Sequence, residues 1–591
     1  MGRPYFWAFY RASIQAINKR SPDELLVLFL AFCAALIYSI GQIPGTLKPL
    51  TIILGIPFLI LTLWSYLRFA AVVRSELGRK ITIGFWALLI AQLFWAFFRA
   101  PLDVDGIFYH LTTVLHSLQE NEWLPDGGFY IWQAKTAPKM GVIPNLLTVG
   151  LMGPWGYRFA QVGHFSSAII GSFALMKLAR VLKWWPGKAS VFGLLFFFTP
   201  IVQKQMTSNY VDLALFSYFF AGIYFAIRTL EPKPGTDKTT WGSWVLLLMA
   251  SVFLLCGTKT NGIMLVFALV PFIFYGWFSP MKKTRLALIV SLVFVSVVGS
   301  CALWMVPNYL DWGNPIIPLQ PQGLIPGSGV SFVSEHTPVV AMQGPVSKLS
   351  FSPGIQWFLS FFVIESVAST DMVGGAWGFV AIWAWIVLVY SLLSTLIRKS
   401  LNWKSLNWKT FYQNARDERI LRVNLLVVAC VVLATIANPG WMVPRYNIAI
   451  GFLILVPAVL IYRTDFLAKA KRSFRYLLFL CLFLQLPYVL IDRPVLRGTS
   501  GALKISENFA IVAENFIDIL TDGEPQHPNR WLHFEYVPSL RRDEPREVFV
   551  GEDCVSLTAL YWGRKFSNHV NASPACCRWP FPCEKLKNEL K

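Results

Sequence analysis

Two acids and two histidines stand close together in the stretch DVDGIFYHLTTVLH, directly after the apolar run ITIGFWALLIAQLFWAFF. A carboxylate such as Asp103 or Asp105 can take a proton from a hydroxyl group or coordinate a divalent cation. Tyr109 and His116 follow Asp105 at helical spacing, which predicts a short helix lying along the membrane surface. Polar residues also mark the end of a membrane span, so this stretch alone leaves a reactive site and a polar helix end equally open.

Three further charged residues border apolar runs on the same predicted side of the membrane. Asp212 follows TPIVQKQMTSNY, Lys259 lies in GTKTNG, and Arg445 lies in PRY. Charged groups beside membrane spans are costly unless they are paired or face an aqueous cavity, so they often mark a functional path. The two cations suit an anionic ligand, and the carboxylates suit a general base. Lys259 and Arg445 could instead extend to the interface or pair with the carboxylates, and both readings stay open.

Membrane helices must position these residues, because the composition excludes an ordinary soluble protein. The chain has 591 residues, of which 55% are hydrophobic and 14% are charged, and its mean hydropathy is +0.52. A spanning helix needs about 20 apolar residues. The sequence therefore predicts an all-α polytopic membrane protein of about thirteen spans, which begin near Glu24, Leu50, Ile81, Phe159, Ala189, Val211, Ser243, Ile263, Leu286, Gly375, Val423, Tyr446 and Tyr476.

The charge distribution predicts the orientation of the spans. With the N-terminus in the cytoplasm, the cytoplasmic segments carry 29 of the 52 Lys and Arg residues, far more than the opposite loops. This asymmetry is the positive-inside rule. It explains the net charge of +20 without a nucleic-acid partner, and it places the Asp103–His116 stretch outside the cytoplasm. We expect a multi-pass protein of a bacterial inner membrane with the active site and the C-terminus outside the cytoplasm.

Two domains are expected. Residues 1–492 form the transmembrane core, with large outer loops at 99–156 and 307–374. Residues 493–591 form a small extracytoplasmic α/β module with 13 basic and 13 acidic residues, in which FEYVP and REVFVGE are predicted strands. The module contains four of the nine cysteines (Cys554, Cys576, Cys577 and Cys583), which permits disulfides whose pairing the sequence does not fix.

The order of these motifs along the chain resembles the GT-C glycosyltransferases that use polyprenyl-phosphate sugars. The likeness is to the bacterial mannosyltransferase-like, ArnT-like and RgtA/B/C/D-like membrane families. Asp105 followed by Tyr109 and His110 is similar to the acidic and Tyr-His motif of the first outer loop in these families, and VLHSLQEN continues the pattern through His116. The remaining matches are Asp212 as the second outer acid, GTKTNG as the lysine turn, NYLDWGNPIIP with Asn314 at the start of the second large loop, and PRY as the Arg445–Tyr446 pair.

This resemblance implies a GT-C fold and transfer of a sugar from a lipid-phosphate carrier to an extracytoplasmic hydroxyl, with inversion at the anomeric carbon. It implies Asp105 as the base, with Asp103 and Asp212 as supporting acids. Phosphate contacts would come from Lys259 and Arg445, and the other substrate-binding candidates are Tyr109, His110, His116, Asn314 and Tyr446. The implied partners are the polyprenyl-phosphate sugar, a lipid, glycan or protein acceptor, and membrane lipids. A cofactor is not fixed, and the Asp-x-Asp pair of Asp103 and Asp105 leaves a divalent metal open.

The competing function is a multi-pass transporter or flippase of a lipid-linked or anionic substrate. Transporters commonly place charges near the bilayer midplane and repeat their halves. Here the charges lie at predicted span ends and no internal repeat of structural length is present. The sequence also contains no P-loop, dinucleotide fingerprint, GxSxG or HExxH motif. We therefore expect an enzyme before a transporter, and a scaffold role would leave the acidic loop unexplained.

Overall fold

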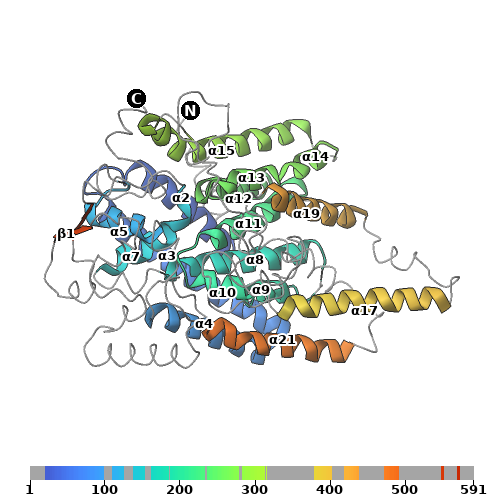
Figure 1. Ribbon diagram of the computed structural model, residues 1–591. Coiled ribbons are helices and arrows are strands. Elements are labelled where there is room, and N and C mark those ends of the chain that lie inside the picture. The colour runs from blue at the N-terminus through green and yellow to red at the C-terminus, as the bar shows by residue number, and fades with distance from the viewer. Residues whose placement is uncertain are drawn as a thin grey trace, which may run out of the picture.

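The computed structural model describes residues 20–98, 110–124, 138–153, 161–184, 187–232, 236–278, 282–312, 315, 379–401, 418–437, 471–491, 547–550 and 569–572. Within these ranges the chain is almost entirely helical (Figure 1). The helices of the first half are α2 (Pro22–Ser39), α3 (Leu47–Leu77), α4 (Arg79–Phe98), α5 (Leu111–Glu120), η2 (Met140–Val142), α7 (Ile143–Met152), η4 (Val162–His164), α8 (Phe165–Val181), α9 (Ser190–Phe197), α10 (Pro200–Met206), α11 (Asp212–Leu230), α12 (Lys238–Thr258), α13 (Asn261–Phe267) and α14 (Val270–Phe278).

The second half contributes four long helices and one strand pair. They are α15 (Lys283–Trp312), α17 (Phe379–Leu401), α19 (Glu418–Ala437), α21 (Lys471–Ile491), β1 (Glu547–Val550) and β2 (His569–Ala572). The two strands pair in parallel, with Glu547 opposite His569. The predicted strand in REVFVGE is confirmed as β1, whereas β2 was not expected from the sequence and FEYVP lies outside the described residues.

The helices confirm an all-α polytopic membrane protein. Six helical segments of the described chain are long and apolar enough to cross a membrane, among them α3, α11 and α15. Twelve of the thirteen expected spans correspond to described helices that begin within about two turns of the expected start, and the span near Tyr446 lies outside the described residues. Large apolar side chains remain exposed on α3, α4 and α15, as lipid contact requires.

Two expected spans are wrong as single helices. The run after Ala189 is divided into α9 and α10, because Thr199 is extended before Pro200, which occupies the first helical position. The run near Ile263 is divided into α13 and α14, of seven and nine residues. The predicted start of the second outer loop at Pro307 also moves, because Pro307 lies inside α15 and the helix continues to Trp312.

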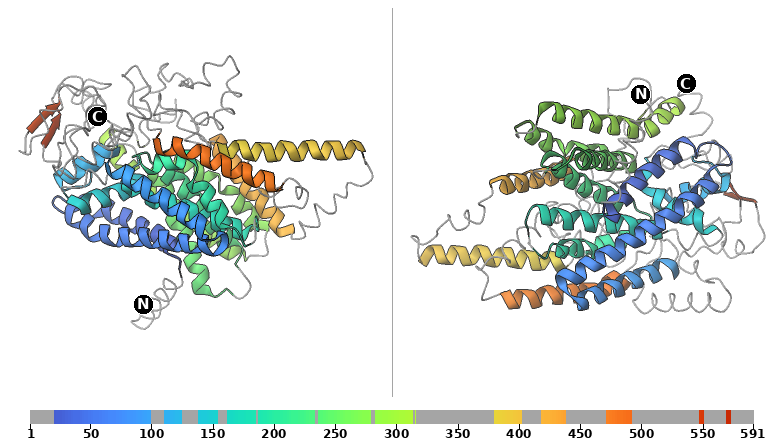
Figure 2. Two further views of the ribbon diagram at one scale, coloured as in Figure 1. Left: turned by 90° about the horizontal axis from the view of Figure 1, so that it is seen from below. Right: turned by 180° about the vertical axis from the view of Figure 1, so that it is seen from behind.

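The centre of the helical body is formed by α2, α8, α11 and α12. α11 packs against both α8 and α12, and α2 contacts α3, α8 and α12. α11 is buried almost throughout, so it is surrounded by protein rather than lipid. α4 and α21 lie along one edge of the body and α15 along the opposite edge, while α17 projects beyond it (Figures 1 and 2).

Contacts between the connecting segments divide into two ends. At one end the backbone of Asn121 accepts bonds from Gly45 and Leu47, and Trp123 N donates to Gly41 O at 2.6 Å. Segments of the first predicted outer loop thus meet the turn between α2 and α3. At the other end Lys177 binds Asp23, and Arg180 binds Glu76. The loops therefore alternate between two ends, as the charge pattern predicted.

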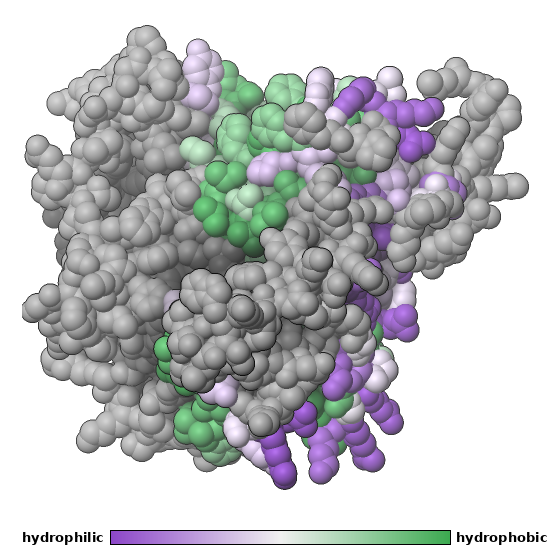
Figure 3. All heavy atoms as spheres, turned by 90° about the vertical axis from the view of Figure 1, so that its right-hand side faces the viewer, coloured by the Kyte–Doolittle hydropathy of each residue, from purple (hydrophilic) through white to green (hydrophobic). Residues whose placement is uncertain are grey.

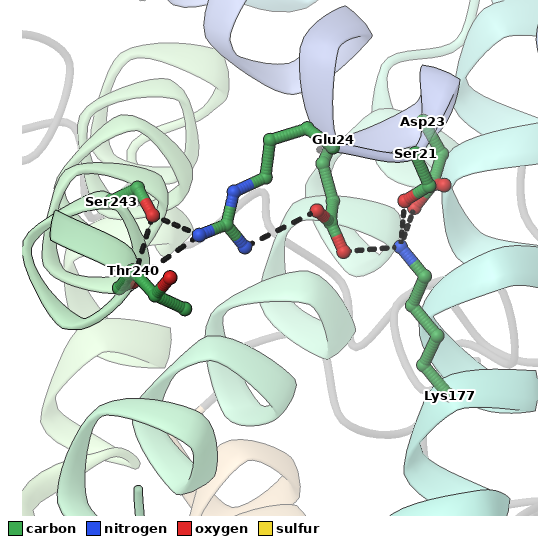
Figure 4. Close-up of polar contacts among 7 residues, drawn as sticks. Ser21, Asp23, Glu24, Lys177, Thr240 and Ser243 are labelled. Carbon is green, nitrogen blue, oxygen red and sulfur yellow. Dashed lines mark hydrogen bonds and ion pairs between the residues drawn. The ribbon is translucent and has the colours of Figure 1, made fainter. Parts of the chain in front are cut away.

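The second end contains a buried ionic cluster, which joins the starts of α2 and α12 to the end of α8 (Figure 4). Lys177 Nζ donates to Ser21 Oγ at 2.6 Å, Asp23 Oδ2 at 2.6 Å and Glu24 Oε1 at 2.7 Å. Arg20 lies 3.5 Å from Glu24 and donates to the Thr240 carbonyl at 3.2 Å. Hydrophilic side chains also gather along one margin of the face shown in Figure 3, beside the apolar helices.

Candidate functional site

Asp212 and Lys259 form a buried ion pair at the first end of the body. Lys259 Nζ lies 2.7 Å from Asp212 Oδ1, and the two side chains are 21% and 1% exposed. Asp212 is the first residue of α11, and Lys259 follows the last residue of α12. Because α11 and α12 are consecutive, packed helices, the start of one lies beside the end of the other.

Local structure favours each charge at its position. A carboxylate in the first turn of a helix and an ammonium at a helix C-terminus both interact favourably with the helix dipole. Lys259 itself is extended, with φ −156° and ψ 152°, and ends α12. The turn then closes when Gly262 N donates to Lys259 O at 2.7 Å. The lysine turn expected from GTKTNG is therefore present, and of the two sequence readings for Lys259 the structure shows pairing with a carboxylate.

Part of the first outer loop inserts beside this pair. Gly141 in η2 packs so closely that a Cβ there would lie 2.8 Å from both Val211 and Thr258, the residues directly before Asp212 and Lys259. Met140 continues the contact, since its sulfur lies 3.9 Å from Ser300 Oγ of α15. Residues that the sequence assigned only to an outer loop thus form part of the packed wall next to the ion pair.

Lys139 directly precedes this inserted segment and is fully buried. Its backbone N donates to the Tyr38 hydroxyl at 3.1 Å, which fixes the segment to α2. Burial disfavours the charged ammonium and lowers the pKa of Lys139 to about 7. Sequence reasoning missed Lys139, because a lysine in a polar loop gives no sign of burial until the fold of the loop is known.

Asn145, His164 and Asn209 form a polar group behind Asp212. Asn145 Nδ2 of α7 donates to Asn209 Oδ1 at 3.0 Å, and Asn209 lies three residues before Asp212. His164 is fully buried, and its imidazole interacts with the backbone of Asn209 and with the charge of Asp212. The sequence suggested only a helix-packing role for His164, and the two asparagines carried no recognisable motif.

His110 and His116 lie on the short helix expected after Asp105. α5 begins after His110, and Asn121 ends it in a left-handed conformation with φ 57°. His116 Nδ1 lies 4.0 Å from Glu120 Oε1. Both histidines are buried, at 3% and 4% exposure, so they face the protein rather than an open surface. α5 packs on α3 and on α7, the helix that follows Lys139 and Met140.

Six residues of the predicted site lie outside the described residues. They are Asp103, Asp105, Tyr109, Asn314, Arg445 and Tyr446. The residues that can be placed therefore form one charged pair with a buried polar surround. Within the described part of the chain, no three His, Cys, Asp or Glu side chains are grouped to hold a metal ion. The metal considered for Asp103 and Asp105 remains a prediction.

The described arrangement combines groups that suit a charged substrate. An ammonium has three N–H donors, so Lys259 can keep one on Asp212 while another contacts an anionic oxygen. The Asp212 carboxylate in turn balances the ammonium in a site where an uncompensated charge would be costly. Such a pair provides fixed positive charge near a boundary of the apolar helices.

Comparison with known proteins gives structural neighbours only. No protein-family model and no curated protein matches the chain. ArnT from Cupriavidus metallidurans in the apo state is similar, with a TM-score of 0.42 and 15% sequence identity over 75% of this chain and 70% of that chain. The structure of the same protein bound to undecaprenyl phosphate has a TM-score of 0.40 and 16% identity over 74% and 70%. The likeness to ArnT-like proteins expected from the sequence thus recurs as a similarity of fold.

Proposed function

We propose that this protein is an integral membrane glycosyltransferase. It moves a sugar from a polyprenyl-phosphate carrier to an acceptor hydroxyl on the extracytoplasmic side of a bacterial inner membrane, with the N-terminus in the cytoplasm. The observation that carries the proposal is the ion pair of Asp212 and Lys259, at 2.7 Å. It joins two of the motifs on which the sequence resemblance rests, although they are 47 residues apart in the chain.

The reaction requires a base and a stabilised leaving group. The acceptor oxygen attacks the anomeric carbon while its proton passes to the Asp105 carboxylate, and the bond from that carbon to the phosphate oxygen breaks. The electron pair leaves with the carrier phosphate, whose charge is stabilised by Lys259 and Arg445. A hydroxyl is a very weak acid, so the proton transfer is concerted with attack. Direct displacement through an oxocarbenium-like state inverts the anomeric configuration.

Asp212 and Asp103 support the reacting groups in this proposal. Asp212 holds Lys259 in place through the buried ion pair, so that the ammonium is already oriented when the phosphate arrives. Asp103 either orients Asp105 or joins it in holding a divalent cation. The cation would add positive charge at the leaving phosphate.

The proposal is tested by incubating the purified protein with labelled polyprenyl-phosphate sugars and measuring release of the carrier phosphate. Asp105→Asn removes the base, so transfer should fall by a factor on the order of 10² to 10⁴, while expression and melting temperature stay unchanged. Asp237→Asn is the matched control, because Asp237 is an exposed helix cap of α12 and asparagine caps equally well.

Two results would contradict the proposal in different ways. Full transfer by Asp105→Asn would remove Asp105 as the base but leave the enzyme class intact. Absence of carrier-phosphate release, together with movement of a lipid-linked substrate across proteoliposomes, would instead favour the transporter.

A further inference from the structure

Three segments far apart in the sequence meet behind Asp212. They are the start of α7, the short helix η4 and the turn before α11. Gly163 of η4 touches Asn145 so closely that a Cβ there would lie 2.2 Å from Asn145 Oδ1 and 2.4 Å from Asn145 N. Any larger residue at position 163 would separate the two segments. The contact fixes η4, and therefore His164, relative to α7.

His164 connects this junction to the ion pair. It is the last residue of η4 and is fully buried. Its imidazole interacts with the backbone of Asn209 and with the charge of Asp212, and Asn209 receives the side-chain bond from Asn145. We call Asn145, His164 and Asn209 the polar brace. The brace touches the turn on which the first residue of α11 depends.

The turn itself is weakly held by local bonds. Ser208 N donates to Gln205 O at 3.2 Å, and Tyr210 N donates to Ser208 Oγ at 3.2 Å. Both bonds are at the long end of the normal range. Contacts from outside the turn therefore contribute much of what determines where α11 begins and where its first carboxylate lies.

We propose that His164 is a positioning residue for Asp212. Supported by Asn145 and Asn209, it sets the position of the Asp212 carboxylate, so that Oδ1 stays on Lys259 and the ammonium is held ready for an anionic group. The catalytic consequence rests on the proposed glycosyl transfer. The effect on Lys259 itself does not, because it is a property of the protein without substrate.

The first test measures the reactivity of Lys259 toward an amine-directed reagent, read by mass spectrometry of the labelled peptide. His164→Leu removes the polar contacts and loosens the Asp212–Lys259 pair, so Lys259 should react several-fold faster. His164→Gln keeps an N–H donor and should restore most of the protection. Asn145→Ala breaks the bond to Asn209 and should give an intermediate rate, which also covers the case in which His164→Leu does not fold.

Tyr66→Phe is the matched control. Tyr66 donates from its hydroxyl to Phe165 O at 2.8 Å, next to His164, so the variant removes a buried hydrogen bond from the same segment without touching the polar brace. It should lower stability by about 1 kcal/mol and leave Lys259 reactivity and sugar transfer at wild-type levels.

The second test measures sugar transfer in the same variants. A misplaced pair should slow transfer by a factor on the order of ten or more in His164→Leu, with recovery in His164→Gln. Unchanged Lys259 reactivity in both His164→Leu and Asn145→Ala would overturn the positioning role. Failure of the wild-type protein to transfer any sugar would instead count against the proposed function, while the reactivity measurement would still decide the role of His164.

Discussion

Single residues separate into those that their sequence neighbours revealed and those that only the fold revealed. Asp212 and Lys259 were predictable, because each is a charge bordering an apolar run. Their partnership was one of two open readings, and it was decided by the packing of α11 on α12. Lys139, Asn145 and Asn209 could not be predicted, because their importance comes from burial in a loop whose path the sequence pattern does not specify. Whether Asp103 and Asp105 act as proposed remains a prediction.

Lys139 makes a prediction about pH. Its pKa is near 7 in the folded protein and about 10.4 when unfolded, so between these values the unfolded chain binds one more proton. Stability should therefore rise as pH increases from about 7 to 10, and the burial penalty is complete below pH 7. The measurement is the melting temperature in detergent at several pH values.

Lys139→Met removes the titrating group but keeps its length. It should raise the melting temperature at pH 7 and flatten the dependence between pH 7 and 10. Lys48→Met, at an exposed position, is the control. Identical pH profiles for wild type and Lys139→Met would refute the assignment.

At the scale of elements, hydropathy located most helices but not their interruptions. Pro57 and Pro307 lie inside continuous helices, whereas Pro200 begins a new one. A proline inside a membrane helix is tolerated when neighbouring groups satisfy the freed carbonyl, and this depends on tertiary contacts. The sequence could therefore predict the apolar runs but not which of them would break. For the same reason it could not show that α5 and α7 would be buried within the first outer loop.

The ionic cluster of Figure 4 predicts a contrast between two cations near the end of α8. Lys177 is 11% exposed and is the partner of both Asp23 and Glu24, whereas Arg180 is 45% exposed and pairs with Glu76. Lys177→Met leaves buried carboxylates uncompensated and should cost about 3–5 kcal/mol. Arg180→Met should cost about 1 kcal/mol or less.

Unfolding in detergent measures both variants, which remove the same charge from the same helix. Similar losses of stability in the two would show that the buried cluster does not hold α2 and α8 together.

The whole molecule has two chemically different ends. Contacts among the segments near Asn121 define one end, and the ionic cluster of Figure 4 defines the other. The sequence predicted this alternation because topology follows the count of basic residues in each loop. The α/β character of the tail was predicted in outline, and the pairing of β1 with β2 is the part of it that the structure describes. The domain boundary at residue 492 remains a prediction.

Orientation can be tested with a membrane-impermeant maleimide on intact spheroplasts. Lys48 and Lys188 are both exposed and belong to opposite ends. The Lys48→Cys variant should be labelled from outside, and the Lys188→Cys variant only after the membrane is permeabilised. Labelling is read from the individual peptides, so the native cysteines do not interfere. The reverse result would invert the proposed topology and place the Asp212–Lys259 pair in the cytoplasm.

The ionic cluster also has a consequence for how the chain is made. Asp23 and Lys177 are in contact in the finished protein but are 154 residues apart in sequence. At synthesis rates of about 5–20 residues per second, the two acids at the start of α2 wait for roughly 8–30 s before their lysine emerges from the ribosome. During that interval α2 has two carboxylates without their final partner. The first helix can therefore complete its packing only after the fourth predicted span has been inserted, and assembly must proceed through a state in which this end of α2 is still in contact with water or lipid headgroups.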